Sequence, residues 1–154
     1  CKLLGWREFE DMAASILNYN GFTTLKHLRF KAKGRWFEID VLGSRESLAL
    51  SIDCKHWKRS WQRAATMKIV EKQLQRTTAL TNSFQKVGNR LGVNGWKKVE
   101  ILPLILTLSE TPLKAYEKVP VVPIFYFQNF LDNELYAYLD DFKVYEVRDE
   151  ADQE

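Results

Sequence analysis

Two short segments of alternating polarity, separated by a turn, constrain the fold of this chain most. Trp36–Leu42 and Leu48–Cys54 are rich in aromatic, β-branched and aliphatic residues, and the intervening Gly43–Glu46 has the composition of a turn. Because successive side chains of a strand point to opposite faces, the pattern predicts an antiparallel hairpin with one face in a hydrophobic core. The apolar positions that we expect in that common core are Phe37, Ile39, Val41, Leu50, Ile52 and Cys54.

The opposite face of this hairpin would carry crowded charges. Asp53 and Lys55 share a face with Ser51 in the second strand, and Glu38 and Asp40 share a face in the first. Adjacent carboxylates repel one another, and burial resists their ionisation. A divalent cation resolves this conflict, since Mg²⁺ needs only one or two carboxylates when water and substrate phosphate supply its other ligands. The alternative is a solvated strand surface with ordinary alternating charges.

The rest of the chain mixes helical and strand periodicities. We expect helices over Trp6–Asn18 (stopped by Gly21), Met67–Leu80 and Phe127–Leu139 (with Asn129 as N-cap), and strands over Phe22–Phe30, Val99–Leu108, Val119–Tyr126 and Phe142–Val147. Asn82–Gly95 has the composition of a helix end plus loop, and Pro103 indicates an edge strand or a bulge. This order predicts one α/β domain over residues 1–147, a sandwich with a mixed central β-sheet flanked by helices, and a frayed acidic tail over 148–154.

The charge distribution points to a polyanionic partner. The chain has 154 residues and a net charge of only +3, but residues 12–37 contain no acid and residues 55–100 contain only Glu71 and Glu100. The C-terminal third is acidic instead, and a basic front of this kind is typical of nucleic-acid binding, although an unevenly charged solvated surface is the alternative. The residues expected to contact nucleic acid are Lys31, Lys33, Arg35, Lys58, Arg59 and Arg63. Trp57 and Trp61 would stack on bases, or else anchor the next helix or a dimer contact.

Several classes of protein are disfavoured by the composition. No apolar run approaches the ~20 residues that span a membrane, and no signal peptide opens the chain. The two cysteines, Cys1 and Cys54, are too few for a disulfide scaffold and lack zinc-site spacing, so we expect Cys54 to be a buried free thiol. A cytoplasmic, intracellular protein with no membrane partner fits these features.

The order and spacing of several motifs resemble a known family. The chain resembles the PD-(D/E)XK nuclease superfamily, which has the restriction endonuclease fold, and looks closest to the branch of archaeal Holliday junction resolvases and Mrr-type restriction enzymes. The motifs that carry the resemblance are Phe9-Glu10 before an apolar helix that ends in Asn20-Gly21-Phe22, then Glu38-Ile39-Asp40-Val41, Ser51-Ile52-Asp53-Cys54-Lys55-His56-Trp57, Val121-Val122-Pro123-Ile124 and Asn129-Phe130-Leu131. Together they cover most of the chain, and each is weak alone. Two departures are Ile39, where the motif has proline, and Asp53, where glutamate is more frequent.

The resemblance implies an endonuclease that hydrolyses DNA phosphodiester bonds with Mg²⁺ or Mn²⁺ and leaves 5′-phosphate and 3′-hydroxyl ends. Residue by residue, it implies Glu10, Asp40 and Asp53 as catalytic metal ligands and Lys55 as the catalytic lysine. Members of this branch often act as homodimers, because one active site cuts one strand, so a homodimer is also an expectation. The alternatives are a catalytically inactive nucleic-acid-binding module and a protein-interaction module of the same fold.

Three further residues are secondary candidates. Glu38 shares the predicted acidic face. His56 follows the catalytic lysine but should point to the opposite face, so it is either a phosphate contact or a structural or surface residue. Gln73 would match a polar residue that many family members place near the site, and the alternative is a solvated helix position.

Overall fold

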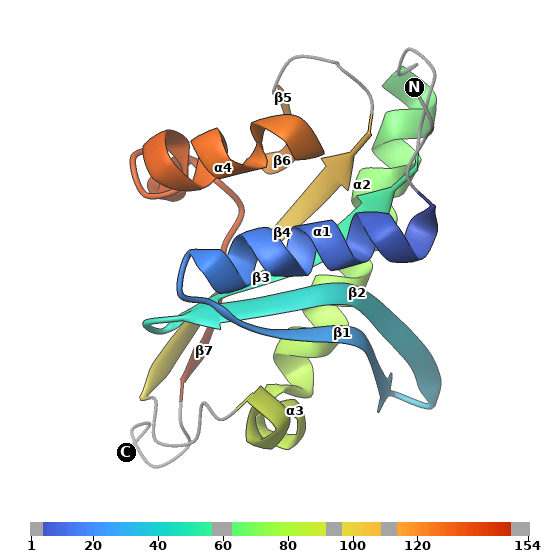
Figure 1. The fold of residues 1–154 in the computed structure, drawn as a ribbon. Helices are drawn as coiled ribbons and strands as arrows, with labels where there is room; N and C mark the ends of the chain where they lie inside the picture. The colour runs from blue at the N-terminus through green and yellow to red at the C-terminus, as the bar shows by residue number, and fades with distance from the viewer. Residues whose placement is uncertain (1–4, 57–62, 92–96, 109–113, 149–154) are drawn as a thin grey trace.

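The structure is a computed structural model that describes residues 5–56, 63–91, 97–108 and 114–148. The helical elements in these ranges are α1 (Trp6–Tyr19), α2 (Arg63–Asn82), α3 (Phe84–Leu91), η1 (Ile124–Tyr126), α4 (Phe127–Asn129), η2 (Phe130–Glu134) and η3 (Leu139–Asp141). The strands are β1 (Thr23–Ala32), β2 (Arg35–Arg45), β3 (Leu48–Lys55), β4 (Lys98–Thr107), β5 (Lys114–Tyr116), β6 (Val119–Pro123) and β7 (Tyr145–Arg148) (Figure 1). None of the helices in the described ranges has the length and apolar character that crossing a membrane requires.

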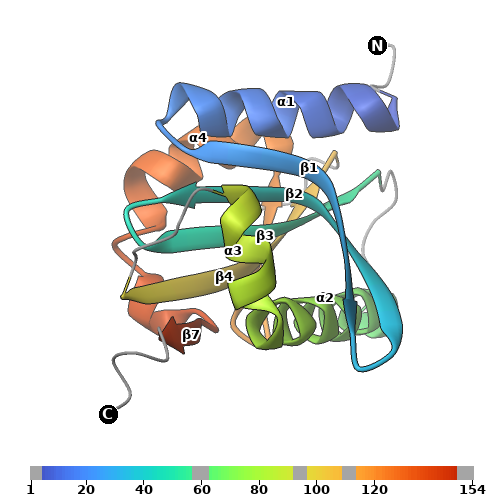
Figure 2. The ribbon, with the colours of Figure 1, turned by 90° about the horizontal axis from the view of Figure 1, so that it is seen from below.

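The described strands form one mixed sheet. The strand order is β1-β2-β3-β4-β6-β5, and β7 pairs with β4. The β1–β2–β3 segment is an antiparallel meander, whereas β4 runs parallel to both β3 and β6. Seen from below, α1 and α4 cover one face of the sheet, and α2 and α3 cover the other (Figure 2). The predicted α/β sandwich with a mixed central sheet is therefore confirmed.

The α1 layer lies close against the hairpin. Phe9 and Leu17 of α1 pack in the same buried cluster as Leu50, Ile52 and Cys54. The approach is tightest at Gly43, where an added Cβ would lie 3.0 Å from Cδ1 of Leu17. This close packing sets the distance between Glu10 on α1 and the strands below it.

The β2–β3 hairpin differs from the predicted one in the length of β2 and in the faces of the sheet to which the side chains of β2 point. Strand β2 continues to Arg45, and the turn falls at Glu46 and Ser47, which both have positive φ, so the predicted turn at Gly43–Glu46 was wrong. Val41 packs in the α1-side cluster with Leu50 and Ile52, but Ile39 packs in the cluster on the other face, where Phe37 lies against it. The expected single core for all these apolar residues was therefore wrong, because the pleat of β2 changes phase at Asp40.

Local sequence signals were also overridden in the second half of the chain. The expected loop after Asn82 forms helix α3, whose Phe84 and Val87 are buried. Pro103 lies in the central strand β4 rather than in an edge strand or a bulge: it pairs with Ser51 on one side, and on the other it lies between the β7 and β6 ladders. Its missing N–H therefore interrupts no ladder on that second side.

The C-terminal elements are shorter than expected. Strand β6 ends at Pro123, and the chain turns helical at Ile124, so Asn129 lies inside the helical stretch and the N-cap prediction was wrong. Leu131 and Leu135, which follow in this part of the chain, are buried. Arg148, expected in the tail, is the last residue of β7, and residues 149–154 lie outside the described ranges.

Candidate active site

The site forms where strands β2 and β3 separate. Their ladder has its last pair at Val41 and Ile52, so Asp40 and Asp53 face each other just beyond that pair. Oδ2 of Asp40 accepts a hydrogen bond from the backbone N–H of Cys54 at 2.9 Å. The Asp40 side chain thus binds a β3 backbone group beyond the point where the strand-to-strand ladder ends.

Asp40 has a raised pKa beside Asp53. Its pKa rises from the ordinary value of 3.8 to about 7, and burial is the largest cause. The hydrogen bond from Cys54 acts against this rise, whereas the negative charge of Asp53, a hydrogen bond to its carboxylate and the more distant charge of Glu10 contribute to it. Asp40 therefore stays protonated up to about neutral pH, as expected for a carboxyl group that is desolvated beside a second carboxylate.

Asp53 is buried between two cations. Its side chain is 5% exposed, and its Oδ2 lies 3.5 Å from both Nζ of Lys55 and Nη1 of Arg76. Within the described ranges, this oxygen accepts no hydrogen bond, and Nη1 of Arg76 likewise donates none. Buried polar atoms of this kind are rare in folded proteins, and a ligand commonly satisfies them. Arg76 is a site residue that the sequence reasoning missed, since nothing in the α2 periodicity separates it from the other basic residues of that helix.

Glu10 reaches the site from α1 through a histidine. Its buried carboxylate lies 2.6 Å from Nε2 of His27, whose Nδ1 lies 3.1 Å from Oε1 of Glu38. Burial raises the pKa of Glu10, as does the charge of Glu38, while His27 lowers it. His27 would stand opposite Asp40 in the β1–β2 register, but the ladder omits that pair and His27 has a φ of +54°. The sequence reasoning missed His27, because strand alternation gives no signal for a left-handed residue inside β1.

The donor set fits a divalent cation at the aspartate pair. In residues 5–56, 63–91, 97–108 and 114–148, no three His, Cys, Asp or Glu side chains come together as a ready-made ion site. Two carboxylates are sufficient for Mg²⁺, which retains water ligands, and Oδ2 of Asp53 accepts no hydrogen bond within the described residues, although Lys55 and Arg76 lie 3.5 Å from it. Glu10 is close enough to act electrostatically on Asp40, and its role as a third ligand stays a prediction.

The secondary candidates differ in where they point. The centroid of the His56 ring lies 5.3 Å from that of Trp6 and 6.4 Å from that of Phe9, both on α1. His56 therefore points to the face of the sheet opposite α2, which is the predicted orientation. Gln73 is buried, and its Nε2 donates hydrogen bonds to the backbone carbonyls of Ser51 and Leu104. The alternative of a solvated helix position for Gln73 is therefore wrong.

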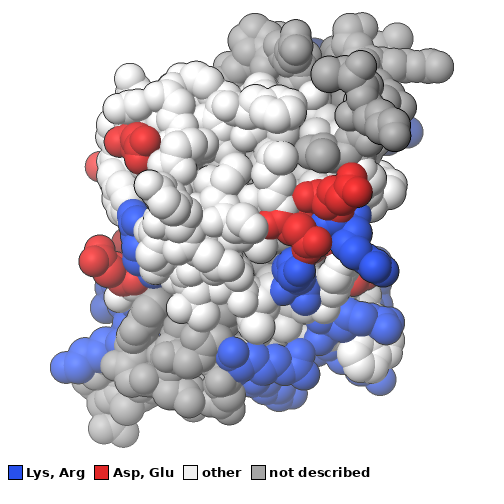
Figure 3. Space-filling model, viewed as in Figure 1, with Lys and Arg blue, Asp and Glu red and all other residues white. Residues whose placement is uncertain are grey.

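The residues predicted to contact nucleic acid are divided between the hairpin and the start of α2. Lys31, Lys33 and Arg35 are exposed on the β1–β2 hairpin, and Arg63 is exposed at the first residue of α2. Figure 3 shows lysine and arginine side chains over this hairpin and over α3. Four predicted residues lie outside the described ranges, namely Trp57, Lys58, Arg59 and Trp61.

A polar cavity of about 380 Å³ opens between β2 and α2 next to the aspartates. Its lining residues are Arg35, Trp36, Phe37, Glu38, Asp40, Lys72, Gln75 and Arg76. Glu38 and Asp40 are its acidic lining residues, and most of the other lining residues are basic or carry an amide. The arrangement suits a cation at the aspartates and an anionic group alongside it.

The buried thiol beside the site is inert. Cys54 is free and buried, as predicted, and burial together with the neighbouring carboxylates raises its pKa well above its ordinary value. A thiol of this kind stays protonated and is a poor nucleophile.

Comparisons with known proteins give similarities without an activity. No family model matches the chain. The chain is 27% identical over 141 residues to an uncharacterized protein of Archaeoglobus fulgidus, covering 89% of this chain and 96% of that protein. It is also similar to the crystal structure of a protein of unknown function, AF1548, with a TM-score of 0.42 and 20% identity over 64% of this chain; the similarity spans only 44% of the length of that protein. The functional argument therefore depends on the chemistry of the site.

Proposed function

We propose that this protein hydrolyses DNA phosphodiester bonds with the help of a divalent cation, Mg²⁺ or Mn²⁺. The observation that carries the proposal is the pair of the partly buried Asp40 and the buried Asp53, with Lys55 and Arg76 beside Asp53, where β2 and β3 separate. A cation bound there would replace the proton that Asp40 otherwise holds, and Oδ2 of Asp53, which accepts no hydrogen bond within the described residues, would be one of its ligands.

Each side chain has a defined task in this proposal. Asp40 and Asp53 hold the ion, and Glu10 approaches Asp40 from the α1 side. When bound, the ion supplies charge stabilisation at the phosphate and a lower pKa for the attacking water. Lys55, whose Nζ lies 3.5 Å from Asp53, donates hydrogen bonds to the phosphate oxygen on which negative charge develops.

The cavity beside the pair would take the DNA backbone. Arg35, Lys72 and Arg76 line it together with Asp40, so a phosphate in the cavity is close to both the basic residues and the aspartates. Arginine and lysine at such positions bind phosphate without reading sequence. A second copy of the chain would be needed to cut both strands of a duplex at once, and sedimentation in the presence of DNA would detect such a dimer.

A nucleic-acid-binding module without catalysis is the second candidate. The observation that favours it is internal charge balance: Lys55 and Arg76 flank Asp53, and His27 binds Glu10. The carboxylates of such a module would be neutralised by the chain's own cations, and the basic cavity would bind DNA without cutting it.

Incubation with supercoiled plasmid DNA distinguishes the two candidates. The wild-type chain is expected to nick the plasmid with Mg²⁺ or Mn²⁺, and EDTA is expected to abolish the nicking. Asp40→Asn is expected to remove nicking and also to weaken Mn²⁺ binding measured by titration calorimetry, whereas the exposed Lys143→Gln variant leaves both unchanged. DNA binding without nicking in either metal would reject the nuclease and support the module.

A further inference from the structure

A second cavity lies beside the active-site cavity, between the tip of the β1–β2 hairpin and α2. It has a volume of about 350 Å³, at the lower end of the ~300–1,000 Å³ typical of small-molecule sites. Arg35, Phe37 and Gln75 line both cavities, so the two are direct neighbours. This cavity is therefore adjacent to the one that contains Asp40.

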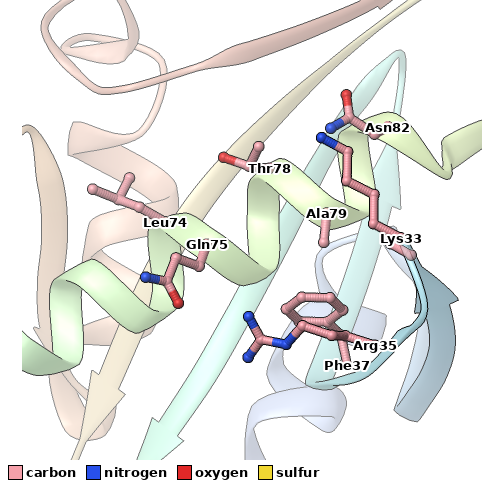
Figure 4. A pocket seen from close by; sticks show the side chains of 9 residues that line it. Lys33, Arg35, Phe37, Leu74, Gln75, Thr78, Ala79 and Asn82 are labelled. Carbon is pink, nitrogen blue, oxygen red and sulfur yellow. The ribbon is translucent and has the colours of Figure 1, made fainter.

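The lining of the second cavity combines an aromatic wall with polar edges. Phe37 faces Ala79 of α2 (Figure 4), and Leu74 and Ala32 add further apolar surface to the lining. The amides of Gln75 and Asn82 lie along α2 at its rim, and both residues are exposed. An aromatic face binds a planar ring by stacking, and side-chain amides match the donor and acceptor pairs on the edge of a base.

Two cations border the same cavity. The Arg35 guanidinium lies 5.2 Å from the centroid of the Phe37 ring, and Lys33 extends across the opening toward Asn82 (Figure 4). Lys72 and Arg76 continue the positive charge into the neighbouring cavity, whose acidic lining residues are Glu38 and Asp40. A purely apolar ligand would leave these cations unused, whereas a base attached to a phosphate backbone uses the aromatic wall, the amides and the cations together.

We propose that this cavity binds one unstacked nucleobase of a DNA strand whose backbone crosses the Asp40–Asp53 site. The inference rests on the proposed nuclease function and deepens it. A base inside a regular duplex is stacked on both faces and paired with the opposite strand along one edge, so it cannot enter the cavity. The favoured substrate is consequently DNA with single-stranded or distorted nucleotides beside the scissile phosphate.

The test compares two single-stranded oligodeoxynucleotides of equal length and phosphate number, one with ordinary bases and one with abasic sites throughout. Binding is measured by fluorescence anisotropy in EDTA, so that no cleavage occurs. The wild-type chain is expected to bind the strand with bases roughly 5- to 150-fold more tightly, as expected for stacking of one base. Equal affinity for the two strands would overturn the proposal.

Two variants test whether the base binds in this cavity. Phe37→Leu removes the aromatic face but keeps an apolar residue against Phe30, and Asn82→Ala removes an exposed amide at the end of α2. Both are expected to lower the affinity ratio of the two strands and to leave binding of the abasic strand unchanged, whereas Gln85→Ala, on the exposed face of α3, keeps the wild-type ratio. A wild-type ratio in both cavity variants would locate base binding elsewhere and overturn the assignment.

The plasmid assay separates this inference from the proposed function. Metal-dependent cleavage by a chain that binds both strands equally would reject the base cavity alone. A base-dependent affinity that Phe37→Leu removes, in a chain that does not cleave, would support the cavity and reject the nuclease. A chain that neither binds nor cleaves DNA would overturn both.

Discussion

At the scale of single residues, two carboxylates that cannot both ionise freely define the site. Asp40 is stabilised in place by the N–H of Cys54, while Asp53 lies between Lys55 and Arg76. Burial and the charge of Asp53 together make the ionised form of Asp40 unfavourable without a cation. The pair stores unfavourable electrostatic energy that metal binding would release.

The pH dependence of stability follows from the raised pKa of Asp40. The folded chain keeps this proton up to about pH 7, whereas the unfolded chain loses it near 3.8, so the folded state binds more protons between these values. The free energy of unfolding of the metal-free protein should therefore fall as the pH rises from 4 to 7. Asp40→Asn should flatten this fall and raise the Tm at pH 8 by a few °C, since about 1 kcal/mol corresponds to ~2–4 °C in a domain of this size. Calorimetric scans in EDTA at several pH values measure the free energy of unfolding and the Tm of both proteins. If stability depended on pH in Asp40→Asn as it does in the wild type, the prediction would be contradicted.

Lys55 should act in turnover rather than in binding. Its ammonium lies beside Asp53 and is one of many positive charges, so its removal changes DNA affinity little. Lys55→Ala should lower the single-turnover cleavage rate by roughly 10²–10³-fold, which is typical of the loss of one positioned charge-stabilising group. Lys68→Ala, which removes an exposed lysine of α2, is the matched control. A normal rate with strongly reduced affinity would show that Lys55 only binds DNA.

At the scale of elements, α2 is tied to the centre of the sheet by polar groups. Gln73 donates hydrogen bonds to the carbonyls of Ser51 on β3 and Leu104 on β4. The hydroxyl of Thr77 donates a hydrogen bond to the Ser51 hydroxyl one turn later. Arg76 lies between Gln73 and Thr77 on α2, so these hydrogen bonds fix the position of its side chain beside Asp53.

Gln73→Leu tests this attachment. The substitution keeps the side-chain volume similar but leaves two buried carbonyls without their amide donor, so it should lower the free energy of unfolding by about 1–3 kcal/mol. Urea unfolding followed by circular dichroism measures the loss. Gln85→Leu, at an exposed position of α3, should change stability by less than about 0.5 kcal/mol. Equal losses in the two variants would show that the buried hydrogen bonds contribute nothing.

At the scale of the whole molecule, charge is distributed unevenly along the chain. The β1–β2 hairpin and α2 carry exposed basic residues, whereas residues 110–154 contain eleven of the twenty acids, five of them outside the described ranges. A polyanion that lies across the hairpin and α2 passes the aspartate pair, since the cavity between β2 and α2 contains Asp40. Affinity and catalysis would then reside on the same face.

The salt dependence of DNA binding tests this placement. If Lys31, Arg63 and Lys72 each contact a phosphate, replacing all three by alanine should flatten the plot of log affinity against log salt by about 0.9 for each lost contact. Binding should weaken equally for unrelated sequences. A charge-matched triple variant at the other end, with Lys118, Lys143 and Arg148 replaced by glutamine, should keep the wild-type slope. An equal effect of the two triple variants would show that only net charge matters.

The sequence predicted those features that local periodicity encodes. The alternation in the hairpin located β2 and β3, the helical spacing located α1 and α2, and the order of elements indicated a mixed α/β sheet. Alternation also placed Asp53 and Lys55 on one face, opposite Cys54, which the structure confirms. These inferences succeeded because the period of a strand or helix depends only on neighbouring residues.

Tertiary structure alone decided those features in which a strand or helix departs from its regular pattern or meets a distant segment. Three features depend on contacts between segments that are far apart in the chain. They are the change of phase in β2 at Asp40, the left-handed backbone of His27 and the position of Arg76 beside Asp53. Pro103 could occupy a central strand because β4 changes partners there, which no local rule reveals. The sequence of β3 determined by itself that Asp53 and Lys55 share a face. The change of phase in β2 and the packing of α1 and α2 around the hairpin decided how deeply Asp40 and Asp53 are buried and which cations accompany Asp53, since burial and charge pairing are properties of the assembled fold.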